Sequence, residues 1–482
     1  MSLNIALGNA LSGLTVSSRM AEVISANVAN AQTDGYGRRI LEVSAMTLGG
    51  RGAGVRIDGI TRVGDVQLLS DRRGAEAGLA ARTRQFESLK AVEAGWGAGI
   101  DGGSVEARIA ALEDALVAAG ADPGSEIRLS MVVTRLNELT GTLRAGSDTI
   151  RAERQRADAG IATEVETLNR SLAQVEALNG RIGQARVAGE DALALIDERQ
   201  RVIDRISAIV PVREVARDNG VVALYSTTGI TLLDGRAAQI GFTPTPTIVA
   251  DMSFAGGALS GLTLNGQPMP GTGGAGRLTG GTLAASFALR DDVLPAQQAA
   301  LDAVARDLIE RFADPATDPT LAPGDAGLLT DGGGAFDPLD SVGLAGRIAV
   351  NAAVDPAQGG ALFRLRDGVN AGLPGPVGAS GQIDAWLDAL ADQRPLASGG
   401  TSRSAAGHAA AASAGLGSAR LAAEEEVGFA AAQYEAYRSR ELAMGVDTDA
   451  EMQRLLLVEQ AYAANARVIE TVDNMLRQLM EI

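Results

Sequence analysis

The sequence contains no cysteine, and it has a single histidine, His408, and a single lysine, Lys90. The absence of cysteine excludes disulfide bonds, thiolate catalysis and cysteine metal sites. A catalytic triad that needs histidine has only one candidate, and His408 lies in an alanine-rich segment with no second histidine to share a metal. We therefore expect His408 to be a packed or exposed side chain, and we expect no cofactor and no metal.

Aromatic residues are also scarce, at 3% of the chain, and the formal net charge is −17. A chain rich in alanine and leucine but poor in aromatics is typical of helices packed by aliphatic side chains. The negative charge repels phosphate backbones, so no nucleic-acid partner is expected. Since arginine supplies nearly all the positive charge, the sequence offers no bulk polybasic patch for a membrane surface.

Long apolar runs are missing as well. No stretch reaches the length needed to span a bilayer, which predicts no membrane insertion. Residues 1–31 lack the basic start and continuous apolar run of a secretory signal, because Asn4, Asn9, Ser12, Arg19 and other polar residues interrupt them. If the protein leaves the cell, we expect a route that cleaves no signal peptide.

The first segment instead shows an amphipathic pattern. Apolar residues recur at steps of three and four, which predicts a helix that ends near Asn30. The stripe consists of Leu3, Leu7, Leu11, Leu14, Ala21, Ile24 and Val28. Residues 36–74 look extended, with Ile40, Val43 and Val55 among glycines, so short strands or an ordered loop are expected there.

The length of 482 residues suggests two to four domains. Residues 75–209 read as long helices broken at Asp122-Pro123. One stripe repeats every 3.5 residues or so, as in coiled coils; it consists of Val165, Leu168, Leu172, Val175, Asn179 and Ile182. Residues 211–285 lose this period and gain glycine, proline and threonine, which predicts a small β-rich domain. Helices are expected again at 286–312, 382–390 and 401–444, whereas residues 313–380 are hard to assign.

The last segment has the clearest pattern. Thr448-Asp-Ala-Glu451 predicts a capping box, in which the Thr hydroxyl and the Glu carboxylate bond free amides at a helix start. A strict alternation of three- and four-residue steps then predicts a helical seam of Leu455, Val458, Tyr462, Asn465, Ile469, Val472, Leu476 and Leu479. A polar Asn465 inside such a seam costs stability but sets register. This seam must meet the N-terminal helix, another subunit or both, so we take both stripes as the candidate assembly interface.

Two other patterns have simpler interpretations. Gly271-Thr-Gly273-Gly-Ala-Gly276 matches a dinucleotide-binding motif, but its flanks lack the required strand and helix, so a flexible loop is expected. Six aspartates offer oxygen ligands at irregular spacing that misses the calcium-loop pattern, so solvated turns are expected. These residues are Asp314, Asp318, Asp325, Asp331, Asp337 and Asp340.

A resemblance to the N-terminal signature of flagellar rod, hook and hook-associated proteins is carried by Ser25-Ala-Asn27-Val-Ala-Asn30-Ala-Gln-Thr-Asp-Gly35-Tyr36-Gly-Arg-Arg39. Their C-terminal signature is similar to Gly445-Val-Asp447 together with Glu459-Gln-Ala-Tyr462-Ala-Ala-Asn465-Ala-Arg-Val468. The two signatures stand in the family's order, one at each end of the sequence. On this resemblance, the family-motif positions of the N-terminal segment are Asn27, Asn30, Gly35 and Tyr36.

The middle of the chain resembles the hook-associated protein 1 family. The similar segments are Asp122-Pro123-Gly-Ser-Glu-Ile-Arg-Leu129, Leu195-Ile-Asp197-Glu-Arg199-Gln-Arg-Val-Ile-Asp204 and Gly280-Gly281-Thr-Leu-Ala-Ala-Ser-Phe287. The resemblance implies a non-enzymatic, extracellular axial subunit at the hook–filament junction, exported by the flagellar type III apparatus. Its implied partners are further copies in a ring or helical layer, hook protein, hook-associated protein 3 and a cytoplasmic export chaperone.

We therefore expect a mainly α fold with a smaller β-rich domain. The expected division is a terminal coiled-coil domain (residues 1–35 and 445–482), a long helical middle domain (36–210 and 286–444) and an outer β-rich domain (211–285). Two alternatives stay open. One is a distal rod or hook subunit, and the other is a surface hydrolase on an export scaffold, which would need paired acids or a metal site in a cleft.

Overall fold

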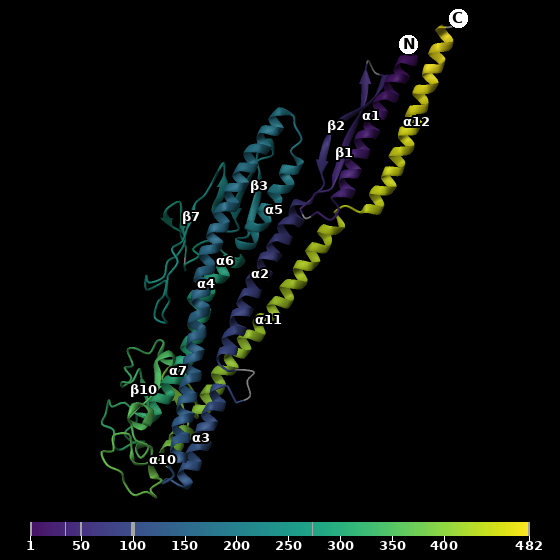
Figure 1. The fold of residues 1–482 in the computed structure, drawn as a ribbon. Helices are drawn as coiled ribbons and strands as arrows, with labels where there is room; N and C mark the ends of the chain where they lie inside the picture. Colours follow the sequence, from purple (N-terminus) through teal and green to yellow (C-terminus); the bar gives the residue numbers. More distant parts are fainter. Residues whose placement is uncertain (1, 34, 49–50, 98–101, 272, 481–482) are drawn as a thin grey trace. The chain divides into compact units, whose positions relative to one another are not determined.

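The computed structural model describes residues 2–33, 35–48, 51–97, 102–271 and 273–480, and it confirms a mainly helical fold with small separate sheets (Figure 1). The helices are α1 Ser2–Ala29, α2 Val66–Gly95, α3 Val105–Ala121, α4 Glu126–Ala188, α5 Leu193–Ile209, α6 Gly281–Ala288, α7 Leu294–Phe312, α8 Leu344–Arg347, α9 Arg364–Asp367, α10 Gly381–Ala391, α11 Ala405–Ala443 and α12 Thr448–Met480. The strands are β1 Arg39–Leu48, β2 Arg51–Arg62, β3 Val212–Ala216, β4 Val222–Ser226, β5 Thr231–Asp234, β6 Arg236–Ala237, β7 Ile240–Gly241, β8 Thr263–Leu264, β9 Gln267–Pro268, β10 Leu329–Asp331, β11 Ile348–Val350, β12 Arg394–Leu396 and β13 Gly399–Arg403.

The chain forms two compact units, and the first contains both terminal helices. This unit consists of Met1–Ala77, Asn169–Ala238 and Ala430–Ile482. Within it, α12 lies beside α1, and the antiparallel hairpin β1–β2 packs along α1 (Figure 1). The N-terminal stripe is therefore covered partly by α12 and partly by the hairpin.

The first unit also holds a four-stranded antiparallel sheet in the order β3-β4-β5-β6. Asn219 and Gly220 take positive φ angles of 53° and 73°, and they turn the chain between β3 and β4. Helix α4 reaches this sheet through its buried Asn179, whose amide donates to the Val222 carbonyl at 2.8 Å and accepts from the Val222 N–H at 3.2 Å. The polar position in the α4 stripe thus bonds a strand of the sheet.

The second unit, Gly78–Leu168 and Gln239–Phe429, contains a large apolar cluster drawn from α2, α3, α4, α7, α10, α11 and the loops around them. Trp386 packs edge-on against Phe312 at a centroid distance of 5.6 Å, and its indole N–H donates to the Leu365 carbonyl at 3.1 Å. A π-helical turn, Leu289–Val293, lies between α6 and α7 and buries Arg290, which pairs with Asp158 at 2.7 Å. Leucine, isoleucine, valine and alanine make up most of the cluster, as the composition predicts.

Two segments differ from the prediction. Residues 66–74, expected to be extended, form the first turns of α2, because the Asp65 carboxylate accepts from the N–H groups of Gln67 (2.8 Å) and Leu68 (3.1 Å) and caps the helix. Residues 399–403, expected to be helical from 401 onward, form strand β13 in a hairpin with β12. Helix α11 begins only at Ala405, where the Ser404 hydroxyl accepts from the Gly407 N–H at 3.1 Å.

The remaining candidates for chemistry are structural. His408 is buried at 4% exposure, and its Nε2 lies 2.7 Å from the Arg394 carbonyl, to which it donates. Two of the six aspartates act in exposed turns, as expected: Asp314 accepts from the Ala316 N–H, and Asp337 accepts from the Leu339 N–H, both at 2.9 Å. The prediction is wrong for Asp318, which is buried and accepts from the Val369 N–H at 2.8 Å, and for Asp331, which lies in β10 and pairs with Arg347 at 2.7 Å. The glycine-rich motif at 271–276 lies in the loop between β9 and α6, and its second residue is outside the described part of the chain.

Candidate functional site

The paired terminal helices are the candidate site, and two contacts define their antiparallel register. The Asn27 amide of α1 donates to the Glu451 carboxylate of α12 at 3.1 Å. Further along, Gly13 of α1 faces Asn465 of α12, and a Cβ at Gly13 would lie 2.6 Å from the Asn465 amide nitrogen. The helices therefore approach closely at Gly13, and the polar residue of the predicted seam lies where its neighbour has no side chain.

The predicted stripe residues are buried to different degrees. Ile24, Val458 and Val472 are buried, and Leu11 and Tyr462 are exposed by 59% and 48%. The half-buried members are Leu3, Leu7, Leu14, Val28, Leu455, Asn465, Ile469 and Leu476. The side chain of Leu479 lies outside the described part of the chain. Pairing of α1 with α12 thus covers the predicted seam only in part.

Asn27 is the best-connected residue of the N-terminal motif, and it is only 1% exposed. Its amide nitrogen donates to Glu451 and to the Arg39 carbonyl (2.9 Å), while its oxygen accepts from the Arg39 N–H (2.9 Å) and the Tyr36 hydroxyl (2.9 Å). An aspartate or a glutamine could not place the same donors and acceptors at these positions. Asn27 therefore joins the end of α1, the start of β1 and the start of α12.

The other motif residues lie around this junction. Asn30 is half-buried and donates to the Ala26 carbonyl of its own helix at 2.9 Å. Gly35 has a φ of +76°, and a Cβ there would lie 2.5 Å from Cγ of Arg201, so a side chain would be both strained and blocked. The motif as a whole shapes the turn that follows α1.

Tyr36 is held in its neutral form. Burial raises the pKa of its hydroxyl; the Arg39 guanidinium opposes this effect, and the charges of Asp197 and Glu451 add to it. The hydroxyl therefore keeps its proton at neutral pH and can donate to Asn27. Tyr36 also stacks beneath the Arg39 guanidinium at 5.0 Å from the ring centroid.

The start of α12 differs from the predicted capping box. Asp447 caps the helix, because its carboxylate accepts from the N–H groups of Asp449 (3.0 Å) and Ala450 (3.1 Å). The Glu451 carboxylate instead faces α1 and the hairpin, where it accepts from Asn27 and, at 2.9 Å, from Arg38. These tertiary contacts with an asparagine and an arginine outcompete the local bond that the sequence pattern predicts.

A second apolar stripe on α12 is absent from the predicted interface. Leu457, Val468 and Met475 are exposed by 65%, 42% and 45%. Ala461 and Ala464 lie between Leu457 and Val468 at three- and four-residue steps, and Met475 follows two helical turns further on the same face. This spacing was a sequence signal for the second stripe, but each of its residues directly precedes a residue of the predicted seam, whose pattern is stronger. After α1 has packed, α12 still presents this apolar face to solvent.

The second stripe continues into a groove of about 540 Å³ between α1, β1 and α12. Its apolar wall includes Met20, Ile40 and Leu457, and Arg38 and Arg454 lie among its polar lining residues. Both arginines pair with Glu451, which also lines the groove, so the surface that remains for a partner is mainly apolar and can receive the apolar face of a helix or strand.

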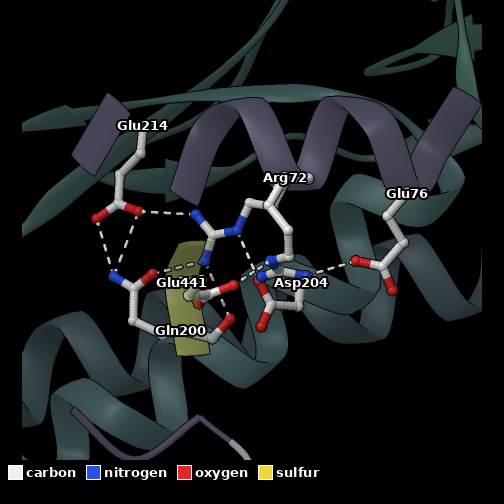
Figure 2. A network of polar contacts seen from close by, with 7 residues as sticks. Arg72, Glu76, Gln200, Asp204, Glu214 and Glu441 are labelled. Atoms are coloured by element: carbon white, nitrogen blue, oxygen red, sulfur yellow. Dashed lines mark hydrogen bonds and ion pairs between the residues drawn. The ribbon is translucent and has the colours of Figure 1, made fainter. Parts of the chain in front are cut away.

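A polar network at the start of α2 also went unpredicted (Figure 2). Arg72 pairs with Glu76 (2.5 Å), Asp204 (2.6 Å) and Glu441 (2.9 Å), which joins α2, α5 and α11. Burial lowers the pKa of Arg72, but the attraction of Asp204, Glu441 and Glu76 outweighs it and raises that pKa overall. Burial also raises the pKa of Glu76, although Arg72 lowers it.

Arg73 completes this network on the other side. Its guanidinium bonds Asp204 at 2.6 Å, the Gln200 side-chain oxygen at 2.6 Å and Glu214 at 3.3 Å. The arrangement ties α2 to α5 and β3 and satisfies the charges of two adjacent arginines. Its geometry is that of a structural connection.

Among the described residues, no group of three or more histidine, aspartate or glutamate side chains is arranged to hold a metal ion. In the same part of the chain, no helix has the length and apolar character needed to cross a membrane.

Comparison with known proteins gives two family matches. The helical domain of flagellar hook-associated protein FlgK matches residues 98–327, and the C-terminal domain of the flagellar basal body rod proteins FlgEFG matches residues 443–482. The second match covers α12, and the first begins before α3 and ends beyond α7.

Several curated relatives are named flagellar hook-associated protein 1. The protein of Salmonella typhimurium is 26% identical over 243 residues, which are 48% of this chain and 43% of that protein. The protein of Bacillus subtilis is 25% identical over 230 residues, 45% of each chain. The chain thus spans less than half of the length of these relatives.

A solved structure of the flagellar hook junction protein FlgK from Burkholderia pseudomallei aligns with a TM-score of 0.43 and 18% identity, over 56% of this chain and 47% of that one. The family matches and the curated relatives confirm the kinship that the sequence motifs predict. Residues 98–327 therefore match the helical domain of flagellar hook-associated protein FlgK, and the chain is similar to curated proteins named flagellar hook-associated protein 1.

Proposed function

We propose that this protein is a structural axial subunit of the bacterial flagellum that joins hook to filament and assembles through its terminal helices. The observation that carries the proposal is the apolar face that α12 retains after it has paired with α1. Leu457, Val468 and Met475 are exposed on this face although each is a large apolar side chain. A shared contact with another copy would remove them from water, which favours association by about 25 cal/mol per Å² of apolar surface buried.

The groove beside this face extends the same surface. A helix of a second copy would bury its apolar stripe against Met20, Ile40 and Leu457. The predicted interface residues that stay exposed, Leu11 and Tyr462, belong to the same pair of helices. In this arrangement the copies share the face that one molecule leaves uncovered.

The named kinship supports the rest of the assignment. The protein would be non-enzymatic and would lie outside the cell in the flagellum, between hook protein and hook-associated protein 3. It would be exported by the flagellar type III apparatus without a cleaved signal peptide, after a cytoplasmic chaperone has covered the terminal helix. The division into a terminal coiled coil, a helical middle domain and an outer β-rich domain belongs to the same proposal.

The test places a charge on each face of α12. Val468→Asp and Met475→Asp change exposed positions, so the monomer should fold normally while assembly is lost. Gln460→Asp is the matched control, because it adds the same charge at an exposed polar position of the same helix. Leu476→Asp and Ile469→Asp change half-buried positions and should also abolish assembly while the middle of the chain stays folded.

The measurements are circular dichroism of the purified variants and electron microscopy of cells that carry them. Normal filaments on cells with Val468→Asp and Met475→Asp combined would refute the assembly role of the second stripe. Loss of filaments with Gln460→Asp as well would show that any added charge is harmful and would remove the support for a specific face.

A distal rod or hook subunit is the second candidate, and the match of residues 443–482 to the rod-protein C-terminal domain favours it. Micrographs of a deletion strain separate the two. Hooks without filaments, with flagellin shed into the medium, are expected for the junction role. Missing hooks would support the rod or hook role instead.

A further inference from the structure

One buried carboxylate bonds three groups at the base of the terminal segment, which we define as α1, β1, β2 and α12. Asp197 of α5 is 6% exposed, and it accepts from the Gly37 N–H at 3.2 Å, from Nε of Arg62 at 2.8 Å and from Arg39 at 3.3 Å. Gly37 and Arg39 stand where the chain enters the hairpin, and Arg62 stands where it leaves. A single side chain of α5 therefore forms hydrogen bonds to both strands of the hairpin at one end.

The covalent connections at this place are short and irregular. Residues 63–65 link β2 to α2, and residues 444–447 link α11 to α12, with neither helix nor strand in between. Large apolar residues at these connections are exposed, by 71% at Val66, 68% at Leu442 and 40% at Met444. Both connections line a cavity of about 220 Å³. Apolar packing is therefore weak where the terminal segment meets the rest of the first unit.

The neighbouring ion pairs do not cross this junction. Arg72 and Glu441 both belong to helices beyond it, whereas Glu451 belongs to α12 and its partner Arg38 directly precedes β1. The contacts of Asp197 do cross it, because α5 lies on one side and the hairpin on the other.

We propose that this junction is a joint and that Asp197 is its latch. With the latch closed, the terminal segment is held in one orientation on α5; when its bonds break, the two connections allow the segment to swing. Charged hydrogen bonds suit such a device, because they are directional and reform readily, whereas a packed apolar contact resists rotation until it is separated. Arg39 and Arg62 are 19% and 23% exposed, so salt can screen them.

The test measures a distance across the joint in the full chain. Because the sequence has no cysteine, spin labels can be attached uniquely through Ser18→Cys in α1 and Ala194→Cys in α5, both at exposed positions. Double electron–electron resonance should give one narrow distance distribution for the labelled parent at low salt. Asp197→Asn removes the charge but nearly preserves the shape, and it should broaden the distribution and raise the population of displaced orientations about tenfold.

Two comparisons make the result decisive. Asp234→Asn removes an exposed carboxylate that pairs with Arg217 in the same unit but away from the joint, and it should leave the distribution narrow. Salt at about 1 M should broaden the parent toward the Asp197→Asn result. If Asp197→Asn loses helix content by circular dichroism, Arg62→Gln replaces it in the test. This substitution removes the partly exposed partner of the same ion pair and should broaden the distance distribution in the same way. A narrow, unshifted distribution in the folded latch variant and at high salt would overturn the proposal.

Discussion

Replacement of Asn27 by alanine offers the sharpest test of how the two ends of the chain are joined. The side chain makes four hydrogen bonds, to both backbone groups of Arg39, to the Tyr36 hydroxyl and to Glu451. At about 1 kcal/mol net for each bond, their loss sets an upper figure of about 4 kcal/mol. Water can replace the partner of the half-buried Tyr36, so we expect Asn27→Ala to destabilise the junction by about 2 to 3 kcal/mol.

Hydrogen exchange followed at single residues is the suitable assay, because a chain with two compact units need not unfold in one step. The Arg39 N–H donates directly to Asn27, so its exchange reports the bond itself. A loss of about 2 to 3 kcal/mol corresponds to a rise in exchange of roughly 30- to 150-fold. Exchange at the start of α12 should rise as well, since Glu451 loses its link to α1.

Asn30→Ala is the matched control. Asn30 belongs to the same motif, but it is half-buried, and its side-chain amide donates to the Ala26 carbonyl of α1 and not to a distant segment. We expect it to change exchange at Arg39 less than about threefold. If Asn27→Ala also leaves Arg39 within about threefold of the wild type, the junction is not held by this side chain and the reasoning fails.

Three further predictions follow from the same structure. Gly13→Ala should destabilise the α1–α12 pair by about 1 to 3 kcal/mol, because the new methyl group would collide with Asn465. Adding Asn465→Ala to this variant should restore part of the lost stability, measured by urea unfolding followed by circular dichroism. Without the close contact, the second substitution would restore none. Asp447→Ala should destabilise the start of α12 by about 1 kcal/mol, measured by hydrogen exchange, whereas Thr448→Ala should destabilise it far less. The reverse order would show that Thr448 is the cap, as the sequence pattern predicted. Burial raises the pKa of Glu164 above its ordinary value of 4.5, so the stability this group contributes is fully present below the unfolded-state pKa and is lost as the pH rises through the raised folded-state pKa. The stability of the wild type relative to Glu164→Gln, measured by urea titration, should therefore fall as the pH rises above the ordinary value of 4.5, and a pH-independent difference would contradict it.

The sequence by itself determined most of the helices and the main apolar stripes of α1, α4 and α12. Helical periodicity is a local property, because the side chains that share a face are only three or four residues apart. The seam of α12, the break at Asp122-Pro123 and the β-rich stretch after Pro211 are therefore readable from local spacing and composition alone. The terminal motifs also indicated the flagellar kinship, because they occur in the family's order at both ends.

The tertiary structure alone decided which polar groups meet. Asn27 and Glu451 lie at opposite ends of the chain, and no spacing rule connects them. The Glu451 carboxylate could bond its own helix or a distant amide and arginine, and only the packing of α1 on α12 settles that competition. The role of Asp197 and the exposure of the second stripe on α12 depend in the same way on contacts between distant segments, since a buried carboxylate takes whichever donors the fold brings within reach.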